Sequence, residues 1–360
     1  MHVLKLNWAF CSAVLLWSVN ALSCDSVLEN YPLECSLQDR HRKVREDLQS
    51  FHGVDASQIA EYRALRFIGR RSWEKSKARG SVDPAQVYTP APRTWNIWAR
   101  GAEFSDSLSP VGPAFIQMDT LREIHRQVID QELMTRWSVL LKGASPGEIR
   151  DSWWKLPPGF SADCKKGQIT EQQARVLLKF DLKDSNGRPM VHANLQPCRE
   201  LKNWVGSPKQ GHAVPAYPDS PYYFGFVTYL SSSRVTEELS RLWTDTSADW
   251  AALLAGKLRG EISPLTLIAD FQRRFIAIHP FGDGNGRTSR LLQDWLLRSL
   301  DLPVASSGDL QHDIDQDPET YRQQFTDALV RSTELLESCL VGYNNSKPSP
   351  ECGELKSLTN

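Results

Sequence analysis

The side chains whose types and spacing could do chemistry lie at residues 279–290, which read HPFGDGNGRTSR. His279 is a candidate base, because the ordinary pKa of histidine lies near neutrality and suits removal of a hydroxyl proton. Asp283 is a candidate ligand for a divalent cation. Arg287 and Arg290 are three residues apart, so on a helix they project from one side and can bind phosphate oxygens. The stretch predicts a di- or triphosphate site beside a histidine.

Two predicted helices position these groups. Ser263 and the proline after it predict a helix start, and apolar residues at helical spacing then lead to His279 (Leu265, Ile268, Phe271, Phe275, Ile278). The proline after His279 disfavours helix at that histidine. Gly284 and Gly286 allow positive φ and a close approach of backbone N–H groups to an anion. A second helical pattern runs from Gly286 to about residue 301, so the loop opens onto a helix N-terminus, which favours phosphate.

The segment resembles the signature of the Fic family, H-P-F-x-D/E-G-N-G-R-x-x-R, and matches it at every specified position. Fic proteins typically transfer a nucleoside monophosphate, most often AMP from ATP, to a hydroxyl side chain of a target protein. The resemblance implies a mainly α fold, in which a helical bundle carries a β-hairpin flap. It also implies ATP as substrate, Mg²⁺ as cofactor and a protein partner that presents a hydroxyl.

The same resemblance implies a role for each matching residue. His279 would be the general base, and Asp283 would hold Mg²⁺ between the α- and β-phosphates. The remaining signature residues would bind the phosphates (Gly284, Asn285, Gly286, Arg287, Arg290). A tyrosine in a similar place to Tyr321 lines the base pocket in Fic proteins, although simple core packing explains Tyr321 equally well. Residues 115–130 form another amphipathic pattern, whose His125 we interpret as a packed or capped structural histidine.

A flap is expected upstream of the signature. Residues 146–150 resemble its first strand and residues 225–230 its returning strand, so Phe226, Val227 and Thr228 would hold the target by β-augmentation. An insertion at about residues 155–222 separates the two. Within it, residues 176–182 and 190–195 flank the turn signal Ser185-Asn186-Gly187 and predict a second hairpin. The insertion is either a structural elaboration or a target-selecting element.

The N-terminus indicates export. Lys5, an apolar run at 8–19 and small residues before Cys24 predict a signal peptide at residues 1–23. Six cysteines then remain, and the pairing most local in sequence is Cys24–Cys35, Cys164–Cys198 and Cys339–Cys352, one of fifteen connectivities. A zinc site is the alternative for four residues, but it lacks C-x-x-C spacing (Cys164, Cys198, His192, His212). We therefore expect a periplasmic or secreted protein, delivered to a compartment that supplies nucleotide.

Composition bounds the remaining possibilities. The formal net charge of −1 gives no reason to expect nucleic acid or an anionic membrane as partner. Hydrophobic residues make up 41% of the chain, which allows a substantial core. We expect an N-terminal helical extension at 24–110, a Fic domain at 111–342 and a tail at 343–360 that a disulfide ties down. The oligomeric state cannot be predicted from the sequence.

The predicted function is that of an exported protein adenylyltransferase. UMP transfer or removal of AMP at the same site is the first alternative, and a non-catalytic secreted binding module on a Fic scaffold is the second. Many Fic enzymes carry an inhibitory helix with the pattern S/T-x-x-x-E-G/N, whose glutamate pairs with the arginine here numbered 290. The nearest matches are Ser57 to Tyr62, with Glu61 as the candidate inhibitory residue, and residues 333–338. Both depart from the pattern at its last position.

Overall fold

The computed structural model of the chain describes residues 24–59, 62, 92–129, 145–150, 159–164, 169–200, 219–258, 262–305, 312–349 and 352–353. The predicted signal peptide at 1–23, the candidate inhibitory residue Glu61 and His212 lie outside these residues. Among the residues described, no helix combines the length and the apolar character needed to cross a membrane.

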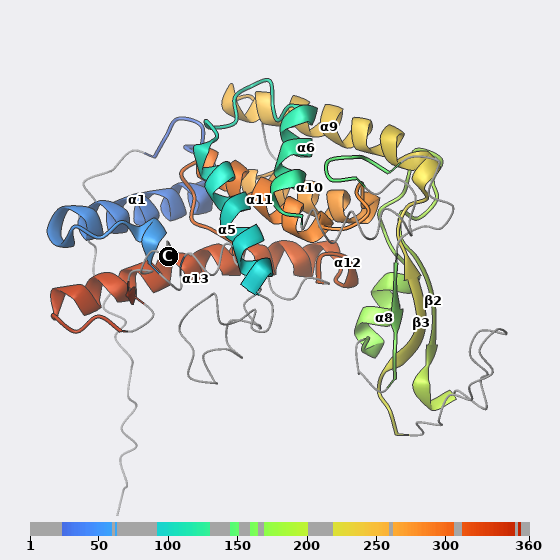
Figure 1. Ribbon diagram of the computed structural model, residues 1–360. Helices are drawn as coiled ribbons and strands as arrows, with labels where there is room; N and C mark the ends of the chain where they lie inside the picture. Colours follow the sequence, from blue (N-terminus) through green and yellow to red (C-terminus); the bar gives the residue numbers. More distant parts are fainter. Residues whose placement is uncertain are drawn as a thin grey trace, which may run out of the picture.

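Helices form the main body, with α10 (Pro264–Ile278) and α11 (Asn285–Ser299) at its centre (Figure 1). Helix α10 packs against α9 (Ser232–Leu254), α11 and α13 (Pro318–Asn344), while α11 also contacts α5 (Pro92–Ser107) and α6 (Met118–Gln127). Helix α1 (Pro32–His52) lies beside α13. A short helix, α12 (His312–Asp315), precedes α13, and a 3₁₀ turn at Ala56–Gln58 follows α1.

The boundaries of the two central helices confirm the sequence signals. The Ser263 hydroxyl accepts a hydrogen bond from the Thr266 N–H at 3.2 Å, which caps α10 ahead of its first-turn proline. Asp317 caps α13 in the same way. Helix α6 is shorter than predicted, because it starts at Met118 rather than at residue 115. Phe115 instead has φ of 56° and packs its ring against Trp250 and other core aromatics.

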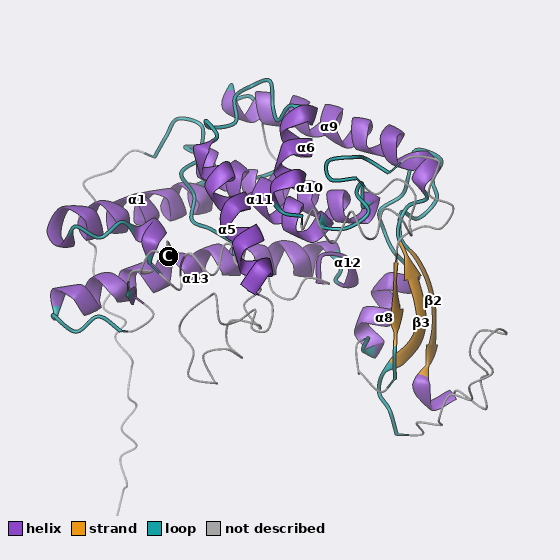
Figure 2. Cartoon of the chain, viewed as in Figure 1, coloured by secondary structure: helices purple, strands orange, loops and turns teal. Residues whose placement is uncertain are grey.

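A small lobe stands to one side of the helical body, as Figure 2 shows. It contains a three-stranded antiparallel sheet with the order β1 (Gly159–Ala162), β3 (Tyr223–Thr228), β2 (His192–Pro197). Helix α8 (Glu171–Leu178) packs on this sheet. The central strand β3 thus pairs with two strands that come from the predicted insertion.

Two strand predictions are wrong. Residues 171–178 are helical, because the Thr170 hydroxyl and the Gln173 side chain form a capping box that starts α8. The turn at Asp184 to Gly187 is present, but only the residues after it form a strand, β2. Residues 146–150 form a turn and an irregular segment instead of the first flap strand. The backbone N–H of Arg150 donates to the Pro280 carbonyl at 2.8 Å rather than to a strand.

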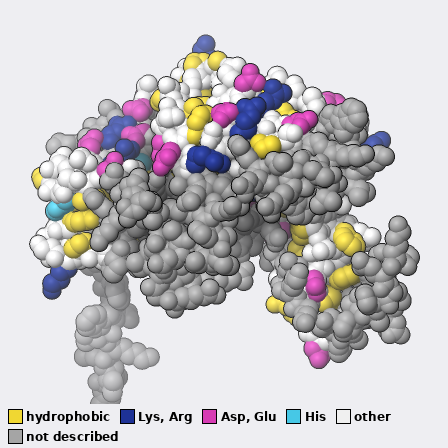
Figure 3. Space-filling view, viewed as in Figure 1, with side chains coloured by type: hydrophobic (Ala, Val, Ile, Leu, Met, Phe, Trp, Pro, Cys, Tyr) yellow, Lys and Arg dark blue, Asp and Glu magenta, His cyan; other side chains and the backbone are white. Residues whose placement is uncertain are grey.

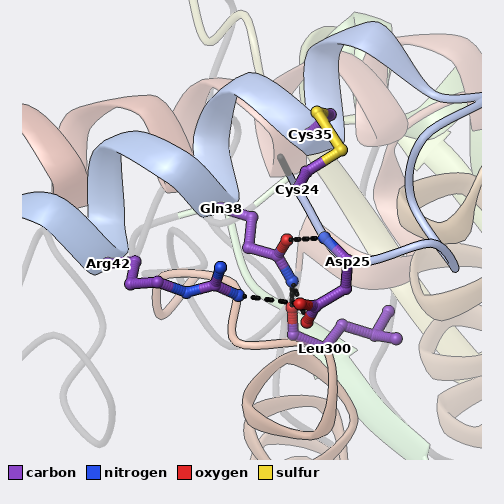
Figure 4. Close-up of a disulfide and its surroundings, with 6 residues drawn as sticks. All are labelled: Cys24, Asp25, Cys35, Gln38, Arg42 and Leu300. Atoms are coloured by element: carbon purple, nitrogen blue, oxygen red, sulfur yellow. Dashed lines mark hydrogen bonds and ion pairs between the residues drawn. A yellow bond between two sulfur atoms is a disulfide. The ribbon is translucent and has the colours of Figure 1, made fainter. Parts of the chain in front are cut away.

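The three disulfides have the predicted pairing, Cys24–Cys35, Cys164–Cys198 and Cys339–Cys352. The zinc alternative at Cys164 and Cys198 is therefore wrong. Figure 4 shows the N-terminal disulfide beside a polar cluster, in which the Gln38 amide donates to the Leu300 carbonyl at 2.7 Å and to the Asp25 carboxylate at 2.9 Å. These bonds fix α1 to the end of α11.

Two arginines of the body hold the lobe. Arg273 on α10 forms a bidentate pair with Asp181, at 2.8 and 2.6 Å, and its side chain is only 2% exposed. Arg234 on α9 pairs with Asp184 at 3.3 Å. The lobe is thus tied to α9 and α10, the two helices that precede the signature. On the upper part of the helical body, basic and acidic side chains are interspersed rather than gathered by sign (Figure 3).

Candidate active site

His279 ends α10 in a strained conformation. Its φ of 53° and ψ of 60° lie in the left-handed region, which costs a non-glycine residue roughly 1–3 kcal/mol. Its ring stacks on the Tyr229 ring, with centroids 3.9 Å apart. Burial first, and the nearby positive charge of Arg150 second, lower the pKa of His279 to about 3. The imidazole is therefore neutral near pH 7, which is the form that can accept a proton.

Hydrogen bonds between one side-chain amide and the backbone close the loop that follows His279. Asn285 accepts from the Phe281 N–H and donates to the Phe281 carbonyl, both at 2.9 Å, and its side chain is buried. Gly284 has φ of 73°, and a Cβ there would lie 2.7 Å from the Ile129 side chain. The positive φ therefore favours glycine at this position, and a larger residue would also have to displace the end of the Ile129 side chain. Gly286, expected in the same loop, lies in the first turn of α11.

His125 supports this loop from α6. It accepts a hydrogen bond at Nδ1 from the Gly147 N–H at 2.7 Å, so its proton is on Nε2, which donates to the Asp283 carbonyl at 2.9 Å. The His125 ring also stacks on Phe281, with centroids 3.8 Å apart. Burial lowers the pKa of His125 to about 4. These contacts agree with the structural interpretation of this histidine.

The start of α11 presents an anion-binding arrangement. No side chain caps its first N–H groups, because the N-cap residue is Gly284. Arg287 is partly exposed and donates to the Asp283 carboxylate at 3.0 Å, while Arg290, one turn later, is buried. The C-terminal end of α10 and the N-terminal end of α11 therefore carry a neutral histidine, uncapped N–H groups and two arginines.

Comparisons with known proteins agree with this geometry. Residues 212–297 match the model of the Fic/DOC family, and the match includes β3, α9, α10 and nearly all of α11. These residues are thus similar to the Fic/DOC family. The signature, the strand before it and the two central helices all belong to the matched stretch.

Individual relatives share less with this chain. A protein named uridine 5'-monophosphate transferase, from Xanthomonas campestris pv. campestris (strain 8004), is 40% identical over 47 residues. Those residues are 13% of this chain and 9% of that protein. A Fic domain containing signaling protein from Bacteroides thetaiotaomicron VPI-5482 aligns in structure over 90% of this chain and 100% of its own, with a TM-score of 0.39 and 14% identity.

The position of the Asp283 carboxylate would suit Mg²⁺. The Asp283 side chain is 56% exposed, so its oxygens are accessible beside the start of α11. Among the described residues, no group of three or more His, Cys, Asp or Glu side chains could hold a metal by itself. One carboxylate fits Mg²⁺ when phosphate oxygens and water complete the coordination, which is the usual manner of binding for this ion with nucleotides.

Tyr321 lies near Arg290, inside the core. It is buried on α13, and burial together with the Asp313 charge raises its pKa well above the usual value, whereas the Arg290 charge acts in the opposite direction. Tyr321 is therefore close enough to Arg290 to interact electrostatically with it. Its place in a base pocket stays a prediction.

Strand β3 cannot hold a target in the expected way. Phe226 faces Ser161 of β1 on one side and Asn194 of β2 on the other, and both neighbours are hydrogen-bonded strands. β-Augmentation needs a free strand edge, so Val227 and Thr228 have no edge left for a target segment. Phe226 is 54% exposed, and its side chain is on the solvent face of the sheet.

The C-terminal candidate for an inhibitory glutamate is engaged elsewhere. Glu337 forms a bidentate pair with Arg40 of α1, at 2.9 and 2.8 Å. This pair joins α13 to α1 and gives Glu337 a structural role.

Two residues of the site escaped the sequence analysis. Tyr229 follows β3 directly, and Arg150 ends the segment that was taken for a strand. Both lay inside segments considered for the flap, but their contacts with His279 join residues 50 or more positions apart, which local patterns do not reveal.

Proposed function

We propose that this protein transfers AMP from ATP to a Ser, Thr or Tyr hydroxyl of a target protein. The observation that carries the proposal is the position of His279 at the end of α10, beside the uncapped start of α11, within a Fic signature that is complete. A base that stays unprotonated near pH 7 and a cluster of phosphate-binding groups are the two requirements of such a transfer.

The reaction divides simply among the residues of the chain. His279 takes the proton of the target hydroxyl, whose oxygen forms a bond to the α-phosphorus as the bond from that phosphorus to the pyrophosphate oxygen breaks. Arg287 and Arg290 stabilise negative charge on the β- and γ-phosphates. The backbone N–H groups at the start of α11 orient the nucleotide, and Asn285 and His125 keep their loop in shape. Pyrophosphate leaves.

Asp283 would hold Mg²⁺, which neutralises phosphate charge when it is bound. In the structure the carboxylate pairs with Arg287. Asp283 and Arg287 therefore lie close enough together to bind the metal and the phosphates of one nucleotide.

UMP transfer is the second candidate, because the relative that is 40% identical over 47 residues is named a UMP transferase. The same His279, Asp283 and arginines would serve, since the phosphates of UTP and ATP are alike. Only the surroundings of the base would differ, and Tyr321 is the residue proposed there.

We further infer that the protein works outside the cytoplasm of the cell that makes it. Three disulfides are compatible with an oxidising compartment, and the N-terminal sequence has the pattern expected of a signal peptide. Because ATP is scarce there, delivery into a nucleotide-containing host or organelle would complete this proposal.

The test is incubation of the protein with Mg²⁺, candidate host lysates and ATP or UTP labelled at the α-phosphate. Label retained on protein, with the modified residue located by mass spectrometry, is the expected result for ATP. Stronger labelling from UTP would select the second candidate. Loss of label from a previously AMP-modified protein would instead identify removal of AMP. No labelling from either nucleotide, at any candidate target, would contradict transferase function and favour a binding module.

A further inference from the structure

Arg150 has an unusual set of partners for a buried cation. Its side chain is 2% exposed, and it donates from Nε to the His279 carbonyl at 2.7 Å. Its two Nη atoms donate to the Ile278 carbonyl at 3.1 Å, the Leu230 carbonyl at 3.1 Å and the Ser232 hydroxyl at 3.0 Å. Every one of these acceptors is uncharged, and burial lowers the pKa of Arg150 to about 10, so the group remains charged near pH 7.

The acceptors belong to two separate pieces of chain, the end of α10 and the connection from β3 to α9. Ile278 and His279 end α10, Leu230 follows β3, and Ser232 begins α9. The last carbonyls of a helix have no partner within it and carry partial negative charge, so a cation is favourable at this end of α10. A planar guanidinium can serve all of these acceptors at fixed angles, which the single ammonium of lysine cannot.

The segment that carries Arg150 is itself fixed. Its backbone N–H donates to the Pro280 carbonyl at 2.8 Å, and the Gly147 N–H donates to His125 at 2.7 Å. A Cβ at Gly147 would lie 3.1 Å from the Arg122 carbonyl, so the turn lies tightly against α6. The segment that carries Arg150 is therefore held in place, which fixes the position of the guanidinium.

His279 needs such support, because a strained backbone persists only where its surroundings determine it. Tyr229 holds the ring by stacking, and Tyr229 is the residue just before Leu230, which Arg150 also binds. One guanidinium thus ties together the backbone of the base and the chain that carries its stacking partner.

We propose that Arg150 is a positioning residue, which fixes His279 relative to the end of β3 so that the base meets a hydroxyl presented beside the lobe. This inference rests on the proposed function for its kinetic consequence. Small displacements of a catalytic group cost on the order of 100-fold in rate, so the effect is expected in kcat rather than in nucleotide binding.

The test compares Arg150→Lys and Arg150→Met with wild type. Lysine keeps the charge but loses the fork of donors, whereas methionine loses both. We expect kcat per folded molecule to fall about 10-fold or more in Arg150→Lys and further in Arg150→Met. The Kd for ATP, measured with Mg²⁺ present, should change less than about threefold, because α11 and its arginines are untouched.

Arg298→Lys is the matched control, since Arg298 also ties two helices together. It donates to the Ser105 carbonyl and hydroxyl at 2.9 and 2.8 Å and to Asp294 at 3.1 Å, at the far end of α11 from the signature. We expect it to lower the Tm without changing kcat per folded molecule. Wild-type kcat in Arg150→Lys, or a loss in both Arg150 variants that only matches their unfolded fraction, would overturn the proposal.

Amide hydrogen exchange supplies a readout that needs neither target nor nucleotide. Residues 278–281 should exchange faster in both Arg150 variants, and at the wild-type rate in Arg298→Lys. Unchanged exchange there would overturn the positioning role. If wild-type protein transfers no nucleotide to any target, the proposed function fails, and faster exchange at 278–281 would still support the role of Arg150 in holding His279.

Discussion

The helical body and the small lobe assemble their surfaces from different kinds of contact. In the body, the groups proposed to bind the nucleotide come from one stretch, residues 279–290, and from the ends of two adjacent helices. In the lobe, β3 pairs with β1 and β2, which come from well before it in the chain, and arginines of α9 and α10 fix their surroundings. Chemistry can thus reside in a short motif, whereas the surface beside it depends on distant pairings.

The largest expected effect comes from replacing the proposed base in the helical body. His279→Ala should lower transfer to every target by roughly 10²–10⁴-fold, which is the usual contribution of a general base. ATP affinity should change little, because the base acts on the target hydroxyl. Transfer rates and the Kd for ATP provide the measurement.

His52→Ala is the control, since His52 lies on α1 and bonds to Asn344 far along the chain. It should transfer normally. Transfer by His279→Ala at the rate of this control would refute the assigned base.

The same contrast explains which features the sequence could predict. Helices α10, α11 and α13 follow from local signals, such as the Ser263 cap, and the three disulfides follow from proximity of cysteines along the chain. The first flap strand was wrong because Arg150 bonds to Pro280, a partner far away in sequence. The β-branched and apolar side chains at residues 176–178 predict a strand, whereas the capping box at Thr170 starts a helix that includes them.

The second prediction concerns the disulfide of the lobe. Cys164→Ser with Cys198→Ser should destabilise the lobe by roughly 3–4 kcal/mol, because the bridge closes a long loop, with 34 residues of separation. Hydrogen exchange should accelerate in β2 and α8, while ATP binding at α11 persists. The Cys339–Cys352 pair, with a separation of 13, is the matched control in the body.

Removing that control bridge should accelerate exchange at the end of α13 and leave β2 unchanged. Equal acceleration of exchange in both regions by either double variant would mean that body and lobe unfold as one unit, and their stabilities would then not be separate.

The third prediction is that the stability of the helical body falls at acidic pH. Burial lowers the pKa of His41 to about 4 from an ordinary value of 6.5, so the folded protein excludes a proton that the unfolded chain binds. Stability from this group is therefore unaffected above pH 6.5 and falls as the pH decreases from 6.5 toward 4. His41→Gln should reduce that dependence, as thermal melting between pH 7.5 and pH 4.5 would reveal.

His41 contacts the Asp301 carbonyl and the Tyr62 hydroxyl, so the loss should first loosen the packing of α1. Exchange of α1 amides at low pH should exceed that of β2 amides. A melting temperature that is independent of pH over this range would show that His41 does not control acid stability.

The smallest expected effect tests how the body orients the lobe. Asp181→Asn removes the charge that Arg273 binds, and because Arg273 is only 2% exposed while Asp181 is 41% exposed, the stability cost should be about 1–3 kcal/mol. Because Arg273 extends from α10, the helix that ends at His279, the lobe should lose its fixed position relative to the base. We expect slower transfer to protein targets with unchanged ATP affinity, in steady-state rates with one purified target.

Asp270→Asn is the matched control, because Asp270 is on the same helix and forms a bidentate pair with Arg322 of α13, inside the body. The two variants remove bidentate ion pairs whose carboxylates are similarly exposed, 41% for Asp181 and 37% for Asp270. Arg273 is 2% exposed and Arg322 43%, however, so Asp181→Asn should lower the Tm more and rates are compared per folded molecule. Only the pair that reaches the lobe should change the rate toward a protein target. If both variants transfer equally well, the orientation of the lobe does not govern target use, and the insertion is a structural elaboration; if only Asp181→Asn is slow, the lobe takes part in presenting the hydroxyl to His279.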